Sequence, residues 1–153
     1  MIRPWNPTMP GDKNDDGALR PGKAPCGTCP YRQDVPSGVW AETEYVKLPE
    51  YDLPMHMQPP GVFMCHQQDG RLCSGWLGCH GAENLMSVRL AAFFDKVDIP
   101  ATFEFKSPVP LFGSGAEAAI HGMEDIDDPS EDALFAIEKL MIKRGEAPDE
   151  DID

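Results

Sequence analysis

The chain has 153 residues and a net charge of −13, from 13 basic and 26 acidic side chains. Direct nucleic-acid binding relies on Lys and Arg that displace counterions from phosphates, so this composition argues against it. No run approaches the roughly 20 apolar residues of a membrane span, and the first residues lack the apolar block of a signal peptide, so we expect a cytoplasmic protein.

Four segments are expected along the chain. Residues 1–25 are rich in proline and glycine and predict a flexible arm. Residues 26–107 hold all five cysteines and predict a metal-binding core domain. Residues 108–145 predict a helical region that packs on this core or on a partner, and residues 146–153 predict an acidic tail. Because most of the negative charge lies in these last two segments, we expect the C-terminal region to contact another protein.

The first elements of the core are predicted from apolar runs and turn residues. Residues 39–48 predict a short helix that ends before a proline, because proline disfavours a helical residue in front of it. Residues 62–64 form an apolar run typical of a short buried strand. The Asp-Gly turn that follows predicts a β-hairpin across residues 62–73.

Two further elements are predicted after the hairpin. Ser74 predicts the N-cap of a helix that runs to about Asp95. Glycines weaken its first turns and favour a start nearer Ala82. Residues 102–106 alternate between apolar and polar side chains and predict a strand, ended by the prolines that follow.

The C-terminal region is predicted to be helical. Residues 114–121 predict a weak helix. Residues 128–131 give a stronger start signal, with Asp as a cap, proline at the first helical position and a capping-box Glu. The helix is predicted to run to Arg144, to stop at Gly145, and to bury Leu134, Ile137, Leu140 and Met141. A short hairpin and about three to four helices around a four-cysteine metal site predict a small α+β domain.

The cysteines carry the strongest functional signal. Cys26 and Cys29 are separated by two residues, a spacing that lets both sulfurs of one turn reach a single ion or cluster. Cys65 and Cys73 lie on the two arms of the predicted hairpin, so its turn brings their sulfurs to one end. Closely spaced thiols in a reducing compartment are more often ligands than disulfides, so these four predict a closed tetrahedral site.

Three other side chains are alternates as ligands. Cys79 and His80 form a second doublet that could replace one of the four, although inside a helix Cys79 is expected to be a buried small hydrophobe. His66 follows a proposed ligand in an extended chain and points to the other side, so a hydrogen-bonding role is expected for it.

We expect the metal to be zinc, which needs only tetrahedral thiolates. The alternative cofactor is a [4Fe–4S] cluster, which needs a larger apolar enclosure and often a proline after a ligand. Pro30 meets the second condition. Two arginines are expected to bind an anion near the site or to pair with nearby glutamates. The side chains expected to support the site are Arg32, Trp40, Trp76 and Arg89.

Two resemblances bear on this site. CGTCPYR, at residues 26–32, resembles the CxxCPxR segment of the WhiB-like iron–sulfur regulators of actinobacteria, and Gly38-Val39-Trp40 is similar to their Gly-[Ile/Val]-Trp turn. That family has a fourth cysteine a few residues later, where this chain has Val-Pro, and a basic C-terminal stretch where this chain is acidic. The resemblance therefore implies a cluster without DNA binding.

The longer resemblance covers residues 24–93. CGTCPYRQDVPSGVW, FMCHQQ, CSGWL and NLMSVRLA follow one another in this order. Together they resemble an uncharacterised domain-of-unknown-function family of small cysteine proteins from actinobacteria and their phages. The resemblance implies that the same four cysteines act together, with Trp76 and Arg89 nearby, and it implies no activity.

Three functions follow as hypotheses. The first is a noncatalytic, metal-stapled module for protein interaction or regulation, because a four-thiolate site leaves no position for water. The second is an iron–sulfur redox or nitric oxide sensor or transcriptional regulator. The third is a thiol or zinc-dependent enzyme. Prolines after the CxxC disfavour the helix that thiol–disulfide chemistry uses, and no histidine precedes Cys26 to complete the zinc deaminase signature.

Overall fold

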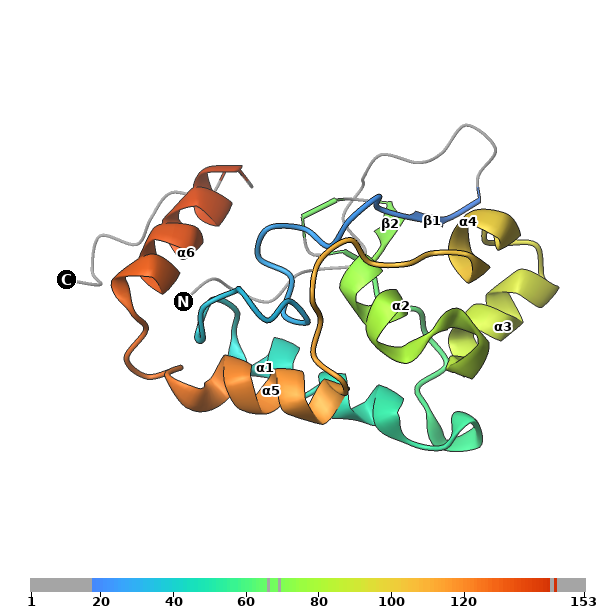
Figure 1. Ribbon diagram of the computed structural model, residues 1–153, viewed down its shortest axis with the longest axis horizontal. Coiled ribbons are helices and arrows are strands. Elements are labelled where there is room, and N and C mark those ends of the chain that lie inside the picture. Colours follow the sequence, from blue (N-terminus) through green and yellow to red (C-terminus); the bar gives the residue numbers. More distant parts are fainter. Residues whose placement is uncertain (1–17, 66, 69, 144, 146–153) are drawn as a thin grey trace.

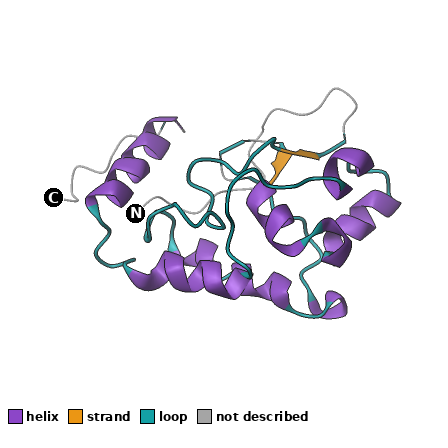
Figure 2. Ribbon diagram, in the orientation of Figure 1, coloured by secondary structure: helices purple, strands orange, loops and turns teal. Residues whose placement is uncertain are grey.

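The computed structural model of the chain describes residues 18–65, 67–68, 70–143 and 145 (Figure 1). Within these residues the predicted α+β class is confirmed, as helices predominate over one small sheet (Figure 2). The elements are β1 (Arg20–Pro21), α1 (Glu42–Tyr45), β2 (Arg71–Leu72), α2 (Ser74–His80), α3 (Met86–Phe93), α4 (Ile99–Phe103), α5 (Gly115–Glu124) and α6 (Glu131–Lys143), with 3-10 turns η1 (Leu48–Asp52), η2 (Met55–Met57) and η3 (Ala82–Asn84).

The hairpin predicted across residues 62–73 is present in a short form. Met64 and Leu72 make an antiparallel bridge. The backbone N–H groups of Cys65 and Cys73 each donate to a carbonyl on the opposite arm at 2.9 Å. These two cysteines therefore flank the bridge, one on each arm.

Residues 18–25, which the sequence analysis assigned to a flexible arm, lie against the core. β1 pairs in parallel with β2, the second arm of the hairpin. β1 therefore adds a third extended segment to the two arms. Leu19 donates its N–H to Lys96 and accepts from Asp98, both at 2.8 Å. The rest of the predicted arm and the acidic tail of residues 146–153 lie outside the described residues.

The helix predicted over residues 39–48 is shorter, and a second turn follows it. α1 covers only Glu42–Tyr45, and Pro49 lies in the first turn of η1 instead of behind the end of a helix. Proline is tolerated there because the N–H that it lacks has no partner in a first turn. The proline therefore marks the start of an element.

The long helix predicted from Ser74 to Asp95 is divided into α2, η3 and α3. Gly81 ends α2 with a φ of 82°, a conformation that glycine adopts without steric cost. Leu85 is extended, so the chain changes direction again before α3. Neither break is visible in the apolar pattern.

The strand predicted at residues 102–106 is wrong, because α4 occupies the first part of this segment. The Asp98 carboxylate accepts the N–H of Ala101 at 3.1 Å, and Pro100 lies in the first turn. An acidic cap followed by proline is a helix start signal, and here it prevails over the alternation of side chains.

Both C-terminal helices are present. Ser114 caps α5, and Ser130, in place of the predicted Asp128, caps the next helix by accepting the N–H of Ala133 at 3.2 Å. α6 is described to Lys143, one residue before its predicted end. Its buried side chains are Ala133, Ile137 and Leu140. These three residues form the face of α6 that packs on the core, so Leu134, which was predicted to be buried, lies off this face and is 49% exposed. Met141, also predicted to be buried, is partly buried.

α5 lies along α1 and η1 (Figure 1). Gly122 of α5 touches the buried ring of Tyr45, and a Cβ at this glycine would overlap the ring. None of the helices in the described part of the chain is long and apolar enough to cross a membrane.

We predict that Gly122→Ala destabilises the protein by about 2 kcal/mol, because an inserted methyl group in a packed contact forces the Tyr45 ring to move. Urea unfolding followed by tryptophan fluorescence measures the change. Gly61→Ala is the matched control, since a Cβ at Gly61 meets nothing within 4 Å. Equal midpoints for the two variants would contradict the close α1–α5 contact.

Candidate metal centre

The four predicted cysteines lie together in the structure. Cys29 and Cys73 have their Sγ atoms 3.8 Å apart. The thiol of Cys26 hydrogen bonds to Cys65. All four are free thiols; Cys26 is partly buried and the other three are buried. Two contacting pairs thus join the CxxC turn to the two arms of the hairpin.

Backbone turns place the first pair of sulfurs. The N–H of Cys29 donates to the carbonyl of Cys26 at 3.0 Å, which closes the CxxC turn. The indole Nε1 of Trp40 donates to the carbonyl of Thr28 at 2.7 Å, and Trp40 is fully buried. Trp40, which the sequence names only as a supporting side chain, therefore anchors the turn to the core by a hydrogen bond.

Backbone N–H groups point at three of the sulfurs. The Sγ of Cys65 accepts from Gln68 at 3.3 Å, and the Sγ of Cys73 accepts from Trp76 at 3.4 Å. Cys26 accepts from the backbone two positions further on. Donors of this kind stabilise the thiolate over the thiol, so the backbone is arranged to support negative sulfur.

The sulfurs shift one another's pKa. The hydrogen bond between Cys26 and Cys65 raises the pKa of Cys26, as does burial, and lowers the pKa of Cys65. Burial raises the pKa of Cys73, and neighbouring Cys29 raises it further. Because each new thiolate disfavours the next, four thiolates need a cation among them.

Across the described residues, no group of three or more His, Cys, Asp or Glu side chains is arranged so that it could hold a metal ion. The sulfurs stand as two pairs. The distance between the two sulfurs of one pair can be compared with the distance between two sulfurs bound to the same zinc ion. A Zn–S bond of about 2.3 Å places neighbouring sulfurs of a tetrahedron about 3.8 Å apart. The Cys29–Cys73 separation of 3.8 Å matches one edge of such a tetrahedron.

Gly75 is a member of this site that the sequence analysis missed. It lies in the first turn of α2, and a Cβ there would overlap the Sγ of Cys29 and lie 3.0 Å from the Cβ of Tyr31. The close approach of the Cys29 sulfur to the helix backbone therefore requires glycine. The position of Gly75, two residues after Cys73, was the signal in the sequence.

Arg32 and the aromatic residues flank the centre. The guanidinium of Arg32 pairs with Asp34 at 2.7 and 2.8 Å, in place of the predicted glutamates, and its pKa is raised mainly by that bond. Trp76 is fully buried and stacks on Phe63 with ring centroids 6.2 Å apart. Arg89 is exposed on α3.

The alternate ligands are placed elsewhere or are not described. Cys79 and His80 line a pocket of about 520 Å³ together with Asp52. Burial raises the pKa of the Cys79 thiol to about 12, so it is a poor nucleophile at neutral pH. His66 lies outside the described residues. The Cys79-His80 doublet therefore lines this pocket.

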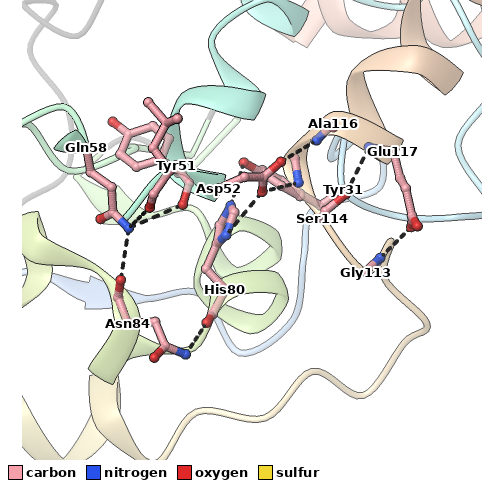
Figure 3. A network of polar contacts seen from close by, with 12 residues as sticks. Tyr31, Tyr51, Asp52, Gln58, His80, Asn84, Gly113, Ser114, Ala116 and Glu117 are labelled. Atoms are coloured by element: carbon pink, nitrogen blue, oxygen red, sulfur yellow. Dashed lines mark hydrogen bonds and ion pairs between the residues drawn. The ribbon is translucent and has the colours of Figure 1, made fainter. Parts of the chain in front are cut away.

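The polar groups of this pocket form a network of contacts between separate elements of the fold (Figure 3). Asp52 accepts the N–H groups of Gly115 and Ala116 at 2.7 and 2.8 Å, and its Oδ1 lies 3.7 Å from Nδ1 of His80. His80 in turn meets the hydroxyl of Tyr31 through Nε2 at 3.4 Å. The network therefore joins η1, α2 and the start of α5.

We predict that Asp52→Ala destabilises the protein by about 1–2 kcal/mol, because two N–H groups at the start of α5 lose a charged acceptor. Thermal unfolding of the variant measures the loss. Asp127→Ala, at an exposed position, is the control and should leave the midpoint unchanged. An unchanged midpoint for both would mean that the cap contributes nothing.

α6 lies beside the CxxC turn. A groove of about 400 Å³ separates them, with Gly27 and Thr28 on one side and Phe135 and Lys139 on the other. Gln67 bridges the groove, since it donates to the Thr28 hydroxyl and accepts from Lys143 at 2.8 Å. The C-terminal helix thus covers one side of the candidate centre.

Residues 21–144 match the model of a family of unknown function, DUF6283. The match includes both cysteine pairs and α6. No curated protein and no solved structure matches the chain.

Proposed function

Because the chain belongs to the DUF6283 family, whose function is unknown, we propose a function from the site itself. The protein is a noncatalytic zinc protein in which Cys26, Cys29, Cys65 and Cys73 bind one ion and α6 presents a surface to a protein partner. Four thiolates complete a tetrahedral shell and leave no position for a reacting water. The ion would supply structural cross-linking between the CxxC turn and the hairpin.

The observation that carries this proposal is the 3.8 Å contact between the sulfurs of Cys29 and Cys73. It has the length of a zinc tetrahedron edge. In a [4Fe–4S] cluster each thiolate binds a different iron, so the four sulfurs stand farther apart around a larger body. The spacing favours zinc over the cluster.

Local features support the same ligands. N–H donors already face three of the sulfurs, and a buried set of mutually repelling thiolates gains most from a divalent ion. A small domain with many loops also gains stability from such a cross-link. A bound cation would offset the charge of the four sulfurs once they are thiolates.

The partner surface is proposed on α6 and the loop before it. Leu134, Phe135 and Ile142 are 49%, 61% and 65% exposed. Exposed acidic side chains lie at the end of α5, on α6 and in the loop between them, so the surface suits a basic protein that buries apolar groups. These acidic side chains are Glu124, Asp125, Asp127, Asp128, Glu131, Asp132 and Glu138.

Anaerobic purification of the full chain, followed by a visible spectrum and quantification of zinc, iron and acid-labile sulfide, tests the metal. About one zinc per chain without colour is expected. A brown protein with about four irons and matching sulfide would replace the proposal with the cluster sensor. A chain without either metal would refute the metal centre.

We predict that the double variant Phe135→Ala, Ile142→Ala captures its protein partner at least about fivefold less well than wild type, because exposed apolar side chains dominate such contacts. Affinity capture with purified full-length chain, read by quantitative mass spectrometry, measures this. Phe93→Ala with Phe94→Ala removes an equally exposed pair from the end of α3 and serves as the control. Equal capture by both variants would exclude α6 as the contact.

A further inference from the structure

We propose that the four cysteines are also an oxidative modification site, at which hydrogen peroxide joins Cys26 to Cys65 and Cys29 to Cys73. The consequence, release of the zinc, rests on the proposed function. The pairing itself depends only on the positions of the sulfurs. The same cluster then has two cross-linked forms, one with metal and one without.

The contacts select this pairing among the three that four cysteines allow. Each sulfur of the CxxC turn touches a sulfur of the hairpin, Cys29 with Cys73 at 3.8 Å and Cys26 with Cys65 through a hydrogen bond. The two sulfurs of a disulfide are about 2.05 Å apart, so the Cys29 and Cys73 sulfurs need only a small movement from 3.8 Å to form this bond. The fifth cysteine, Cys79, lines the other pocket.

The first pair is also the accessible one. Cys26 is the only partly buried member of the four, which are all described, and the groove beside α6 is lined by the two residues that follow it. A small oxidant can therefore reach the Cys26–Cys65 pair before the buried Cys29–Cys73 pair. Once Cys26 and Cys65 are joined, they would no longer bind the ion, and Cys29 and Cys73 would become accessible to the oxidant.

The chemistry balances with peroxide as the two-electron oxidant. A thiolate sulfur attacks one peroxide oxygen, the O–O bond breaks, and a sulfenic acid and hydroxide result. The neighbouring thiol then attacks the sulfenic sulfur, the S–O bond breaks, and a disulfide and water form. From four thiols, two peroxides give two disulfides and four waters. If the four sulfurs held zinc as thiolates, the same reaction would take up four protons and would leave the ion without ligands.

Both disulfides would connect the segments that the ion connects. Each runs from the CxxC turn to one arm of the hairpin, so the oxidised chain keeps the turn and the hairpin together without metal. We therefore expect oxidation to release zinc while the helical circular dichroism of the chain is retained. Direct bonding inside the CxxC turn would instead disconnect it from the hairpin.

Trypsin cleavage distinguishes these outcomes. One tryptic peptide, 24–32, holds both Cys26 and Cys29, and Cys65 lies in 48–71. Peptide 72–89 holds Cys73 and Cys79, so the digest is made in a Cys79→Ser background, where a cross-link to this peptide identifies Cys73. The full chain, zinc-loaded and metal-free, is treated with peroxide, alkylated and digested without reductant. Crosswise pairing links all three peptides covalently. Pairing inside the turn leaves 24–32 alone with an internal disulfide and links 48–71 to 72–89.

Double variants separate the two crosswise patterns. Cys26→Ser with Cys65→Ser keeps the contacting pair, and Cys26→Ser with Cys73→Ser keeps Cys29 and Cys65 as the control pair. Disulfide formation at least about tenfold faster in the first variant is expected from the contact. Equal rates, a 24–32 peptide with an internal disulfide, or sulfinic acids without cross-links would overturn the proposal.

The two proposals fail separately. A metal-free chain that forms the three-peptide product but binds no zinc would refute the zinc function and leave the pairing intact. A chain that holds one zinc but forms any other disulfide pattern would refute the pairing and leave the zinc function intact. Zinc release is followed with a chromogenic chelator in the same samples.

Discussion

Replacing Cys73 by serine should abolish zinc binding and lower the midpoint of thermal unfolding. Cys73 is buried, touches the sulfur of Cys29, and accepts the N–H of Trp76. The apparent binding free energy of a structural zinc ion is on the order of 10–16 kcal/mol, so loss of one of four ligands removes a large part of the stabilisation that the ion supplies. Metal analysis and circular dichroism of the purified variant measure both effects.

Cys79→Ser is the matched control for this prediction. It changes a cysteine of the same core domain that lines the other pocket. This variant should keep about one zinc per chain and lose no more than about 1 kcal/mol of stability. If Cys79→Ser lost the metal and Cys73→Ser kept it, the ligand set would be wrong.

A single methyl group at Gly75 should weaken zinc binding by about 100-fold. In an open helix turn alanine would be better than glycine by about 1 kcal/mol. Here its Cβ would overlap the Sγ of Cys29, so the ligand must leave its place beside Cys73. Displaced support around a metal ligand costs 10- to 100-fold in affinity, and this displacement acts on the ligand itself.

Competition with a chelator of known affinity measures the zinc affinity of Gly75→Ala. Gly27→Ala is the control inside the CxxC turn, since a Cβ at Gly27 meets nothing within 4 Å. It should bind zinc like wild type. Wild-type affinity in Gly75→Ala would show that the Cys29 sulfur does not need its position over α2.

The sequence contains the local features that form the CxxC turn and the hairpin, although not the contact between them. The CxxC spacing indicates one turn, and the hairpin expected across residues 62–73 carries Cys65 and Cys73 on its two arms. Both depend on residues only a few positions apart, which sequence patterns describe well. That these four sulfurs hold a metal stays a prediction.

Long-range contacts could not be predicted in the same way. β1 joins β2 across the chain, and Leu19 bonds to residues near the start of α4, although nothing local marks residues 18–25 as part of the core. The strand predicted in place of α4 failed for the opposite reason. The cap of α4 at Asp98 is a local signal in the sequence. It predicts a helix, whereas the alternation of apolar and polar side chains in residues 102–106 predicts a strand.

The separation of Cys29 from Cys73 by 44 positions has a consequence for how the protein is made. Loop closure over such a distance is slow relative to a local turn, so the site forms only after the intervening segment has collapsed. During synthesis, a chain that has emerged as far as β2 offers only Cys26, Cys29 and Cys65 to a metal ion. Chain growth past residue 73 is therefore the step at which the nascent protein becomes able to complete the proposed four-cysteine site.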